Sequence, residues 1–215
     1  MSGFLSLACV ALAAVATAMM VDVKAGKPAS GNLNGKRVAI LATDGFEQSE
    51  LLEPRKALEA AGAKTFVVSP KSGQIKAWND NNWGVDVAVD LTLDQAKPDD
   101  FDALLLPGGV ANPDKLRIEP KAVLFVKAFV VAGKPVGAIC HGPWTLIEAD
   151  VVRGRKMTSW PSLQTDLRNA GALWTDAEVV TDNGLVTSRK PADIPAFSKH
   201  LIQEIAEGTH AVSKN

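Results

Sequence analysis

Four short apolar runs, separated by segments with helical periodicity, constrain the fold of this chain more than any other feature. Runs of this length are typical of strands buried on both faces of a parallel sheet. Between two of them, Pro120–Ala132 has apolar residues at the i, i+3, i+4, i+7 spacing of an amphipathic helix. The alternation predicts an α/β fold, a flavodoxin-like sandwich whose mainly parallel sheet has helices on both faces. The four runs are RVAILA (37–42), KTFVVS (64–69), DALLLPGG (102–109) and KPVGAIC (134–140).

The remaining segments fit the same architecture. Ser49–Ala61 is predicted to be a helix that stops at Gly62. Gln74–Val89 contains a period-two stretch typical of an edge hairpin, and a second hairpin is predicted to turn at Asn183-Gly184. Three further helices are expected at Pro143–Ala149, Ser162–Ala170 and Asp193–Glu207.

Length and composition indicate a single domain. The chain has 215 residues, 47% of them hydrophobic, and a net charge of −1. We expect one compact domain at 36–210 and a short tail at 211–215. The nearly neutral charge gives no electrostatic case for nucleic-acid binding. Two cysteines and three histidines, without zinc-site spacing, predict no disulfide framework and no metal site.

The N-terminal residues differ in composition from the rest. Phe4–Val21 is an apolar run that contains Ala16-Thr17-Ala18, a small-x-small pattern like a signal-peptidase site. We interpret residues 1–20 as a signal-like or anchor segment and 21–35 as a polar linker, which favours export or membrane tethering. A start at Met19 or Met20, which would leave a cytoplasmic protein, is the alternative.

Polar stretches follow three of the predicted strands. They are Asp44–Glu47, Gly108–Asp114 and Cys140–His141. Because ligands of open parallel sheets bind beyond the carboxyl ends of the strands, the three stretches are expected to line one edge and to form a site there.

Cys140 stands at a predicted turn from strand to helix, the arrangement of a nucleophile elbow. A helix N-terminus lowers the pKa of a thiol and favours the reactive thiolate. The backbone N–H groups of Gly108, Gly109 and His141 are candidates for an oxyanion hole. A buried structural cysteine is the alternative reading of the local pattern.

Together, these stretches resemble the PfpI (intracellular protease I) family. This family belongs to a wider superfamily with the parkinsonism-associated deglycase and the class I glutamine amidotransferase domains. The resemblance covers about Lys36 to Glu207, and its most specific part is ICHGP followed by GRKMTSWP.

The resemblance implies roles for four residues. Cys140 matches the nucleophile, His141 the histidine beside it, and Glu47 the glutamate that contacts the sulfur. Asp114 falls where relatives carry an acid that reaches the histidine from a neighbouring subunit, which implies a homo-oligomer with its site at the interface. Trp160 stands where several relatives have tyrosine, and this chain has no tyrosine.

The resemblance leaves the reaction open. The first hypothesis is a cofactor-free cysteine enzyme that acts on reactive carbonyls, either as a glyoxalase III-like enzyme or as a deglycase. The alternatives are a PfpI-type cysteine peptidase and a non-enzymatic stress chaperone or redox sensor. The partner is accordingly a small carbonyl compound or a glycated or unfolded protein.

Overall fold

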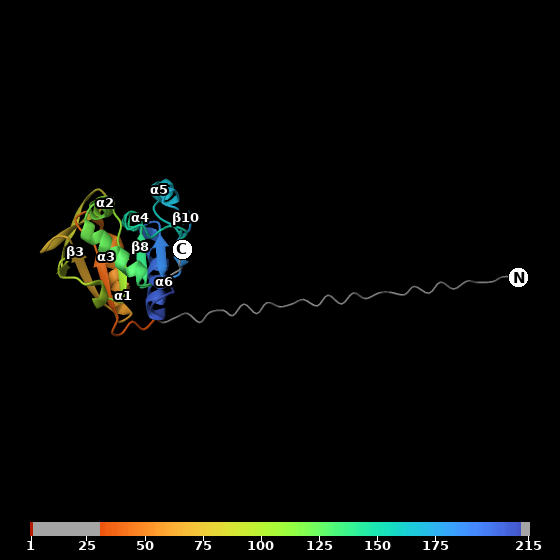
Figure 1. Cartoon of the computed structure of the whole chain (residues 1–215), viewed down its shortest axis with the longest axis horizontal. Helices are drawn as coiled ribbons and strands as arrows, with labels where there is room; N and C mark the ends of the chain where they lie inside the picture. Colours follow the sequence, from red (N-terminus) through yellow and green to blue (C-terminus); the bar gives the residue numbers. More distant parts are fainter. Residues whose placement is uncertain (2–30, 212–215) are drawn as a thin grey trace.

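A seven-stranded, mostly parallel sheet forms the centre of the protein (Figure 1). The computed structural model describes Met1 and residues 31–211. The strand order is β11-β12-β8-β7-β1-β3-β6, and only the β11–β12 pair is antiparallel. The strands are β1 (Arg37–Leu41), β3 (Lys64–Ser69), β6 (Leu91–Thr92), β7 (Ala103–Leu106), β8 (Val136–Ile139), β11 (Val179–Asp182) and β12 (Leu185–Ser188).

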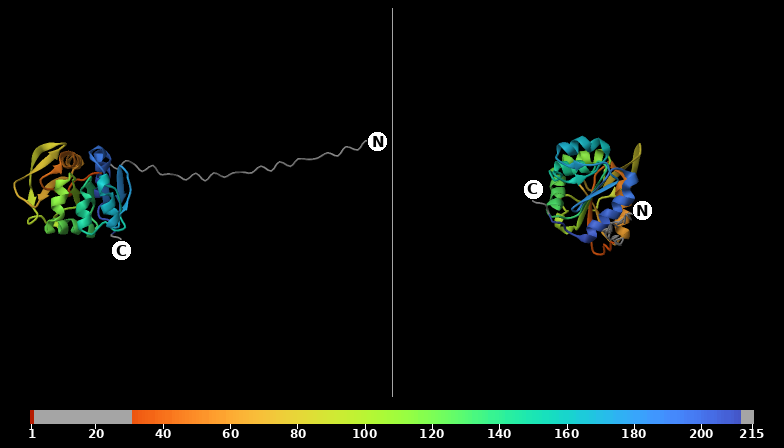
Figure 2. Two further views of the ribbon diagram at one scale, coloured as in Figure 1. Left: turned by 90° about the horizontal axis from the view of Figure 1, so that it is seen from above. Right: turned by 90° about the vertical axis from the view of Figure 1, so that its right-hand side faces the viewer.

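Helices cover both faces of this sheet (Figure 2). The two faces enclose separate apolar cores, and the alternation of side chains along a strand divides each strand between them. In β7, Leu105 belongs to the core beneath α1 and α6, and Leu104 to the core beneath α3, α4 and α5. The helices are α1 (Gln48–Ala60), α2 (Ala111–Arg117), α3 (Pro120–Val131), α4 (Pro143–Glu148), α5 (Gln164–Asn169) and α6 (Ile194–Glu207).

The predicted α/β sandwich is confirmed, and so is the hairpin predicted within Gln74–Val89. This hairpin, β4 (Gln74–Asn79) and β5 (Asn82–Ala88), joins β2 (Phe46–Glu47) in a separate three-stranded sheet, which the periodicity did not indicate. A two-stranded sheet joins β9 (Lys156–Met157) to β10 (Leu173–Trp174). Strands of two residues carry too little alternation to be recognised in a sequence.

The second predicted hairpin turns where the sequence indicated. Asn183 and Gly184 have φ angles of 48° and 84°, which is the left-handed pair that a tight two-residue turn requires. Short 3₁₀ helices occur at Pro98–Asp100, Pro161–Leu163 and Pro191–Asp193.

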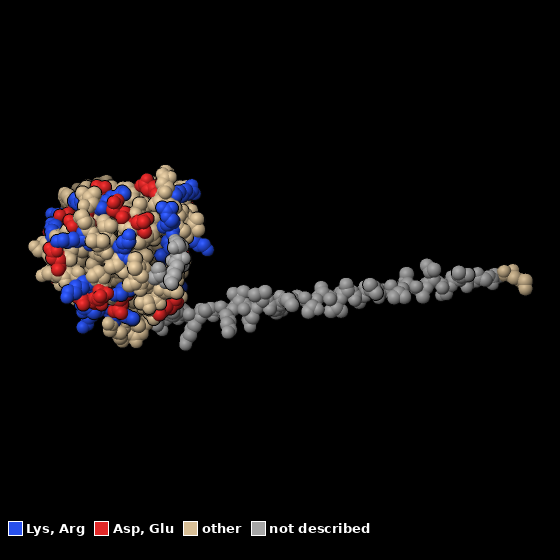
Figure 3. Space-filling view, in the orientation of Figure 1, with Lys and Arg blue, Asp and Glu red and all other residues tan. Residues whose placement is uncertain are grey.

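The predicted signal-like segment and most of the linker lie outside the described residues. Within 31–211, no helix is both long enough and apolar enough to cross a membrane. On the face shown in Figure 3, basic and acidic side chains are interspersed.

Candidate active site

Cys140 occupies a strained turn between β8 and α4. Its φ angle is 60°, in the left-handed region that costs a residue with a side chain about 1–2 kcal/mol. Two backbone hydrogen bonds hold the turn: the Cys140 N–H donates to the Ser188 carbonyl (3.0 Å), and the Cys140 carbonyl accepts from the Trp160 N–H (2.9 Å). The predicted nucleophile elbow is therefore present.

The loop after β7 lies directly against this elbow. A Cβ atom on Gly108 would stand 2.6 Å from the Cys140 Cβ and 2.5 Å from the Glu50 carboxylate, so no side chain fits there. The Gly108 carbonyl also accepts a hydrogen bond from the Glu47 N–H at 3.3 Å. The three polar stretches therefore meet at one edge of the sheet, as predicted.

Glu50, in the first turn of α1, is the acid that interacts with the thiol. Its side chain is fully buried, and its carboxylate accepts a 2.9 Å hydrogen bond from the Gly108 N–H. Burial raises the pKa of Glu50 to about 8, although hydrogen bonds with Cys140 and Gly108 oppose the shift. Glu50 therefore holds a proton at neutral pH and is able to donate it.

His141 approaches the same sulfur from the other side of the elbow. Its Nδ1 lies 3.2 Å from the Cys140 Sγ, and its Nε2 lies 3.4 Å from the Ser162 hydroxyl. The imidazole stacks on Trp160 and contacts Trp144, with ring centroids 5.8 and 5.1 Å away. Burial lowers the pKa of His141 to about 4, so the ring is neutral at neutral pH and is a weaker base than an exposed imidazole.

The thiol lies in a buried environment whose electrostatic effects oppose one another. Cys140 is 6% exposed, and this burial, followed by the charge of Glu50, raises the pKa of the thiol. The backbone N–H groups of Gly109 and His141 interact with the sulfur and favour the thiolate. The prediction of a lowered thiol pKa is wrong because it considered the helix terminus and not the depth of burial.

The same contacts divide the predicted oxyanion donors. The N–H groups of Gly109 and His141 interact with the sulfur, where they are suited to an oxyanion that forms next to it, although the Gly109 N–H also interacts with Glu50. The Gly108 N–H already donates to Glu50, so Gly108 serves to orient the acid.

Comparison with known proteins identifies the family. Residues 36–204 match the DJ-1/PfpI family. The chain belongs to this family. It is 44% identical over 169 residues to protein/nucleic acid deglycase 2 of Escherichia coli, a match that covers 78% of this chain and 96% of the relative. It is 46% identical over 169 residues to general stress protein 18 of Bacillus subtilis, with the same coverage of both chains.

A solved structure shares the fold as well. A two-domain protein of Anabaena variabilis, with DJ-1/ThiJ/PfpI-like and ferritin-like domains, superposes with a TM-score of 0.74 at 35% identity. The match covers 79% of this chain and 48% of that protein. The DJ-1/PfpI domain is thus the part that the two proteins share.

The assignment of the sulfur-contacting glutamate to Glu47 is corrected to Glu50. In this DJ-1/PfpI protein, Glu47 is the extended residue that precedes α1, half-buried, and its backbone pairs with Trp78 in the small sheet. Burial, and then the charge of Asp80, raise the pKa of Glu47. Glu50 stands one helical turn further on, where α1 faces the sheet.

The direction of the His141 ring does not follow from its place in the sequence. Neighbouring side chains normally diverge, which would turn the ring away from the sulfur. The positive φ of Cys140 breaks that alternation, and Nδ1 comes within 3.2 Å of the thiol.

Asp114 does not join the site within one chain. It is exposed on α2, whereas the Nε2 of His141 faces Ser162. The role of Asp114 across a subunit interface remains a prediction.

Two contributors were not recognised from the sequence. Ser162 gave no local signal, since it follows a loop whose path only the fold determines. Glu50 was also missed, although the sequence did contain a local signal for it. It lies on the buried face of α1, which also includes Leu51, Pro54 and Leu58. A carboxylate on an apolar helix face needs a buried partner.

Proposed function

We propose that this DJ-1/PfpI protein is a cysteine-dependent deglycase that hydrolyses early adducts of methylglyoxal or glyoxal with amines. The observation that carries the proposal is the buried thiol of Cys140, placed between a protonated acid, Glu50, and a neutral base, His141. A site that supplies both a nucleophile and a proton donor suits an adduct whose amine must leave as a neutral group. The name of the E. coli relative supports the same reaction.

The first half of the reaction transfers the carbonyl fragment to sulfur. The substrate is an aminocarbinol, R–NH–CH(OH)–CO–CH₃, formed from an amine and methylglyoxal. His141 accepts the thiol proton, and the Cys140 thiolate forms a C–S bond to the carbinol carbon while the C–N bond breaks. The amine leaves with a proton from Glu50, and a hemithioacetal remains on the enzyme.

The second half is an internal redox exchange followed by hydrolysis. A base removes the proton from the carbon bonded to sulfur, and the neighbouring carbonyl carbon gains a proton. The proton of the carbinol hydroxyl passes to the former carbonyl oxygen, so one carbon is oxidised as the other is reduced. The product is a thioester of Cys140. Water then breaks the C–S bond to give lactate, with Gly109 and His141 donating backbone hydrogen bonds to the oxyanion. The sum is adduct plus water to amine plus lactic acid; with free methylglyoxal in place of the adduct, the same steps give glyoxalase III-like hydration.

The exposure of the nucleophile favours small substrates over polypeptides. Cys140 is 6% and His141 7% exposed, and Trp160 stacks on the imidazole. A peptidase needs an extended cleft at its nucleophile, so the peptidase alternative has less support than the deglycase.

The test compares purified protein with its Cys140→Ser variant on two substrates. One is the adduct of methylglyoxal with N-acetyllysine, assayed by release of free amine and lactate; the other is unfolded casein. We expect adduct turnover that falls at least ~100-fold in the variant, because the hydroxyl is a far weaker nucleophile. Full activity in Cys140→Ser, or turnover of casein alone, would contradict the deglycase.

We also propose that a second copy of the chain completes the site. Helix α2 carries Asp114, and the apolar residues Val110 and Ile118 at its two ends are 60% and 81% exposed. A partner that covers these side chains is one way to bring an acid to the histidine of the other copy. Asp114→Asn is expected to lower turnover without unfolding the chain, and dilution to monomers is expected to do the same. A fully active monomer would overturn this model.

Export is a separate proposal that rests on the apolar run Phe4–Val21 and its Ala16-Thr17-Ala18 pattern. N-terminal sequencing of the protein from its native host tests it. A product that begins after Ala18 is expected, and a mature chain that retains Met1 would refute it.

A further inference from the structure

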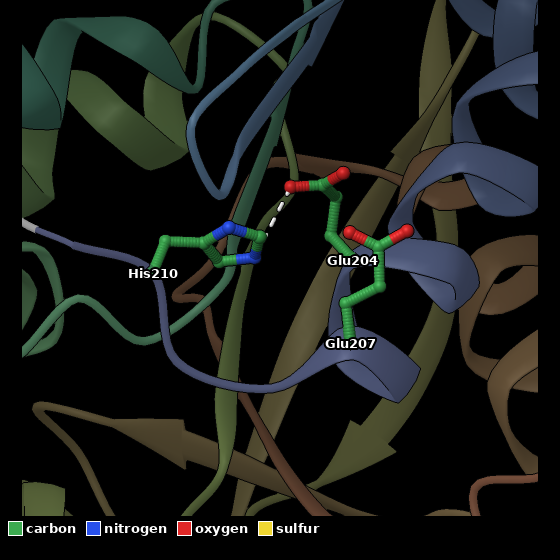
Figure 4. Close-up of side chains that lie close together, drawn as sticks. All are labelled: Glu204, Glu207 and His210. Carbon is green, nitrogen blue, oxygen red and sulfur yellow. Dashed lines mark ion pairs between the residues drawn. The ribbon is translucent and has the colours of Figure 1, made fainter.

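Three side chains with metal-ligating atoms converge at the end of α6, on elements that the proposed reaction does not use. Glu204 and Glu207 lie in the last turn of α6, and His210 follows three residues later (Figure 4). One ligand atom from each lies within 4.8 Å of the others. The spacing E-x₂-E-x₂-H places the two carboxylates on neighbouring positions of one helix face.

Glu204 is the buried member of this cluster and lacks a basic partner from lysine or arginine. It is 7% exposed, and the Gly184 N–H donates to its carboxylate at 3.0 Å. Among the ion pairs of residues 31–211, its only cationic partner is His210. A buried carboxylate requires positive charge close by, which here comes from a proton on His210 or from a bound cation.

His210 presents a nitrogen with no hydrogen bond at this carboxylate. Its Nε2 lies 3.2 Å from the Glu204 carboxylate but is not aligned to donate, and this buried atom has no hydrogen-bond partner in the described part of the chain. A buried donor or acceptor without a partner is destabilising, and coordination of a cation by the lone pair would remove that cost.

The backbone fixes the position of His210. Its N–H donates to the Gly133 carbonyl at 2.8 Å. A Cβ atom on Gly184 would stand 2.8 Å from the imidazole Cδ2, so the absence of a side chain there makes room for the ring. The histidine is thus held against β12 and the end of α3, and the exposed Glu207 is the ligand that is able to move.

We propose that Glu204, Glu207 and His210 form a binding site for a borderline divalent transition metal such as Zn²⁺. One imidazole and two carboxylates, with a fourth position open to water, is a donor set that Zn²⁺ accepts. Tetrahedral ligands of zinc are about 3.4 Å apart, given bonds of about 2.0–2.1 Å. The ligand atoms lie within 4.8 Å of one another, and movement of the exposed Glu207 side chain brings them to the shorter spacing that zinc requires. The metal links the C-terminal segment to α6 and displaces any proton from His210, so acid weakens its binding.

The proposed site is independent of the deglycase reaction and is tested by binding. The full chain carries Cys9→Ala and Cys140→Ala, so that neither thiol competes for metal. Co²⁺ and Zn²⁺ are added to chelator-treated protein. We expect one equivalent of Co²⁺ to give a visible d–d absorption band that Zn²⁺ abolishes, and Zn²⁺ to raise the unfolding temperature.

Matched variants assign the site. His210→Ala is expected to abolish the Co²⁺ band, and Glu207→Gln to weaken Zn²⁺ binding at least ~10-fold, the loss expected of a ligand mutation. His200→Ala, a histidine of the same helix whose ring contacts Thr181, is the control and is expected to bind as the parent does. The proposal is overturned if no band forms, if His210→Ala keeps it, or if His200→Ala loses it, because the cluster is then an ordinary ion pair.

Discussion

At the scale of single residues, the chemistry of this protein depends on the protonation of one buried pair, Glu50 and Cys140. Burial raises the pKa of both Glu50 and Cys140, so the pair resists carrying two negative charges. The Gly108 N–H orients the acid, and the N–H groups of Gly109 and His141 favour charge on the sulfur. Glu50 is therefore equipped to keep its proton until the leaving amine needs it.

Gly108 is the residue whose replacement most directly disturbs this pair. Gly108→Ala would place a Cβ 2.5 Å from the Glu50 carboxylate and 2.6 Å from the Cys140 Cβ. We expect a loss of about 1–3 kcal/mol in the free energy of unfolding, as overpacking typically costs, together with at least ~10-fold lower turnover. Urea unfolding and adduct turnover measure the two effects.

Gly73→Ala is the control for a glycine replaced away from the site. Gly73 has a positive φ (84°), which Gly108 does not, and no atom lies within 4 Å of its added Cβ. The control is expected to cost about 1–2 kcal/mol of backbone strain and to leave turnover unchanged. Equal losses of activity in the two variants would mean that general destabilisation, not the clash at the site, is responsible.

At the scale of elements, the segment from Trp160 through the 3₁₀ helix Pro161–Leu163 covers His141. Trp160 stacks on the ring, and its removal lets water reach the imidazole. We expect Trp160→Ala to raise the pKa of His141 from about 4 toward the ordinary 6.5, because burial is what lowers it.

An NMR titration of the histidine ring protons tests this prediction. The His141 resonance of the parent should not shift between about pH 8 and pH 5.5, and that of Trp160→Ala should. Trp83→Ala, at an exposed tryptophan of the β4–β5 hairpin, is the control and should behave as the parent. A parent His141 that titrates near 6.5 would contradict the burial argument.

The elements differ in how far the sequence determines them. Strand β3 has the predicted bounds, Lys64–Ser69, because the apolar residues 66–68 between polar neighbours leave a clear local signal of a strand. The elbow at Cys140 was also predicted. Helix α2 was not predicted, since its seven residues include an internal proline and form too few turns to show the hydrophobic periodicity of a helix.

The site itself was predictable only in part. The three polar stretches were expected at one edge because strand order places them there. The choice between Glu47 and Glu50 depends on where α1 begins, and one residue of helix rotates a side chain by about 100°. The approach of His141 depends on the φ of Cys140, which no local pattern reveals.

At the scale of the whole molecule, the buried acid makes stability depend on pH. The pKa of Glu50 rises from 4.5 in the unfolded chain to about 8 in the folded one. The folded protein therefore keeps a proton that the unfolded chain loses, and stability falls as pH rises from 4.5 to about 8. At pH 7 the folded state must hold a proton on Glu50 that the unfolded chain would release, and this lowers the free energy of unfolding. Glutamine needs no such proton, so we expect Glu50→Gln to be more stable than the parent by about 3 kcal/mol at pH 7.

Chemical denaturation at several pH values measures this difference. The gain in the free energy of unfolding of Glu50→Gln over the parent should be near zero at about pH 4.5 and should increase through pH 7. The control is Glu53→Gln, at an exposed position of the same helix, which should show no such trend. His141 adds the opposite dependence in the parent and the variant alike, because its lowered pKa destabilises the fold as pH falls from 6.5 to about 4. A gain that does not change with pH would show that Glu50 is not the buried neutral acid.

Glu50 is the group that we expect to supply the proton for chemistry at Cys140. The rate of amine release from the methylglyoxal adduct of N-acetyllysine tests this role in Glu50→Gln and Glu47→Gln, two isosteric changes one helical turn apart. We expect Glu50→Gln to lose at least ~100-fold in kcat/KM, as is typical of a general acid, and Glu47→Gln to stay within about two-fold of the parent. A large loss in Glu47→Gln with Glu50→Gln unaffected would contradict this role.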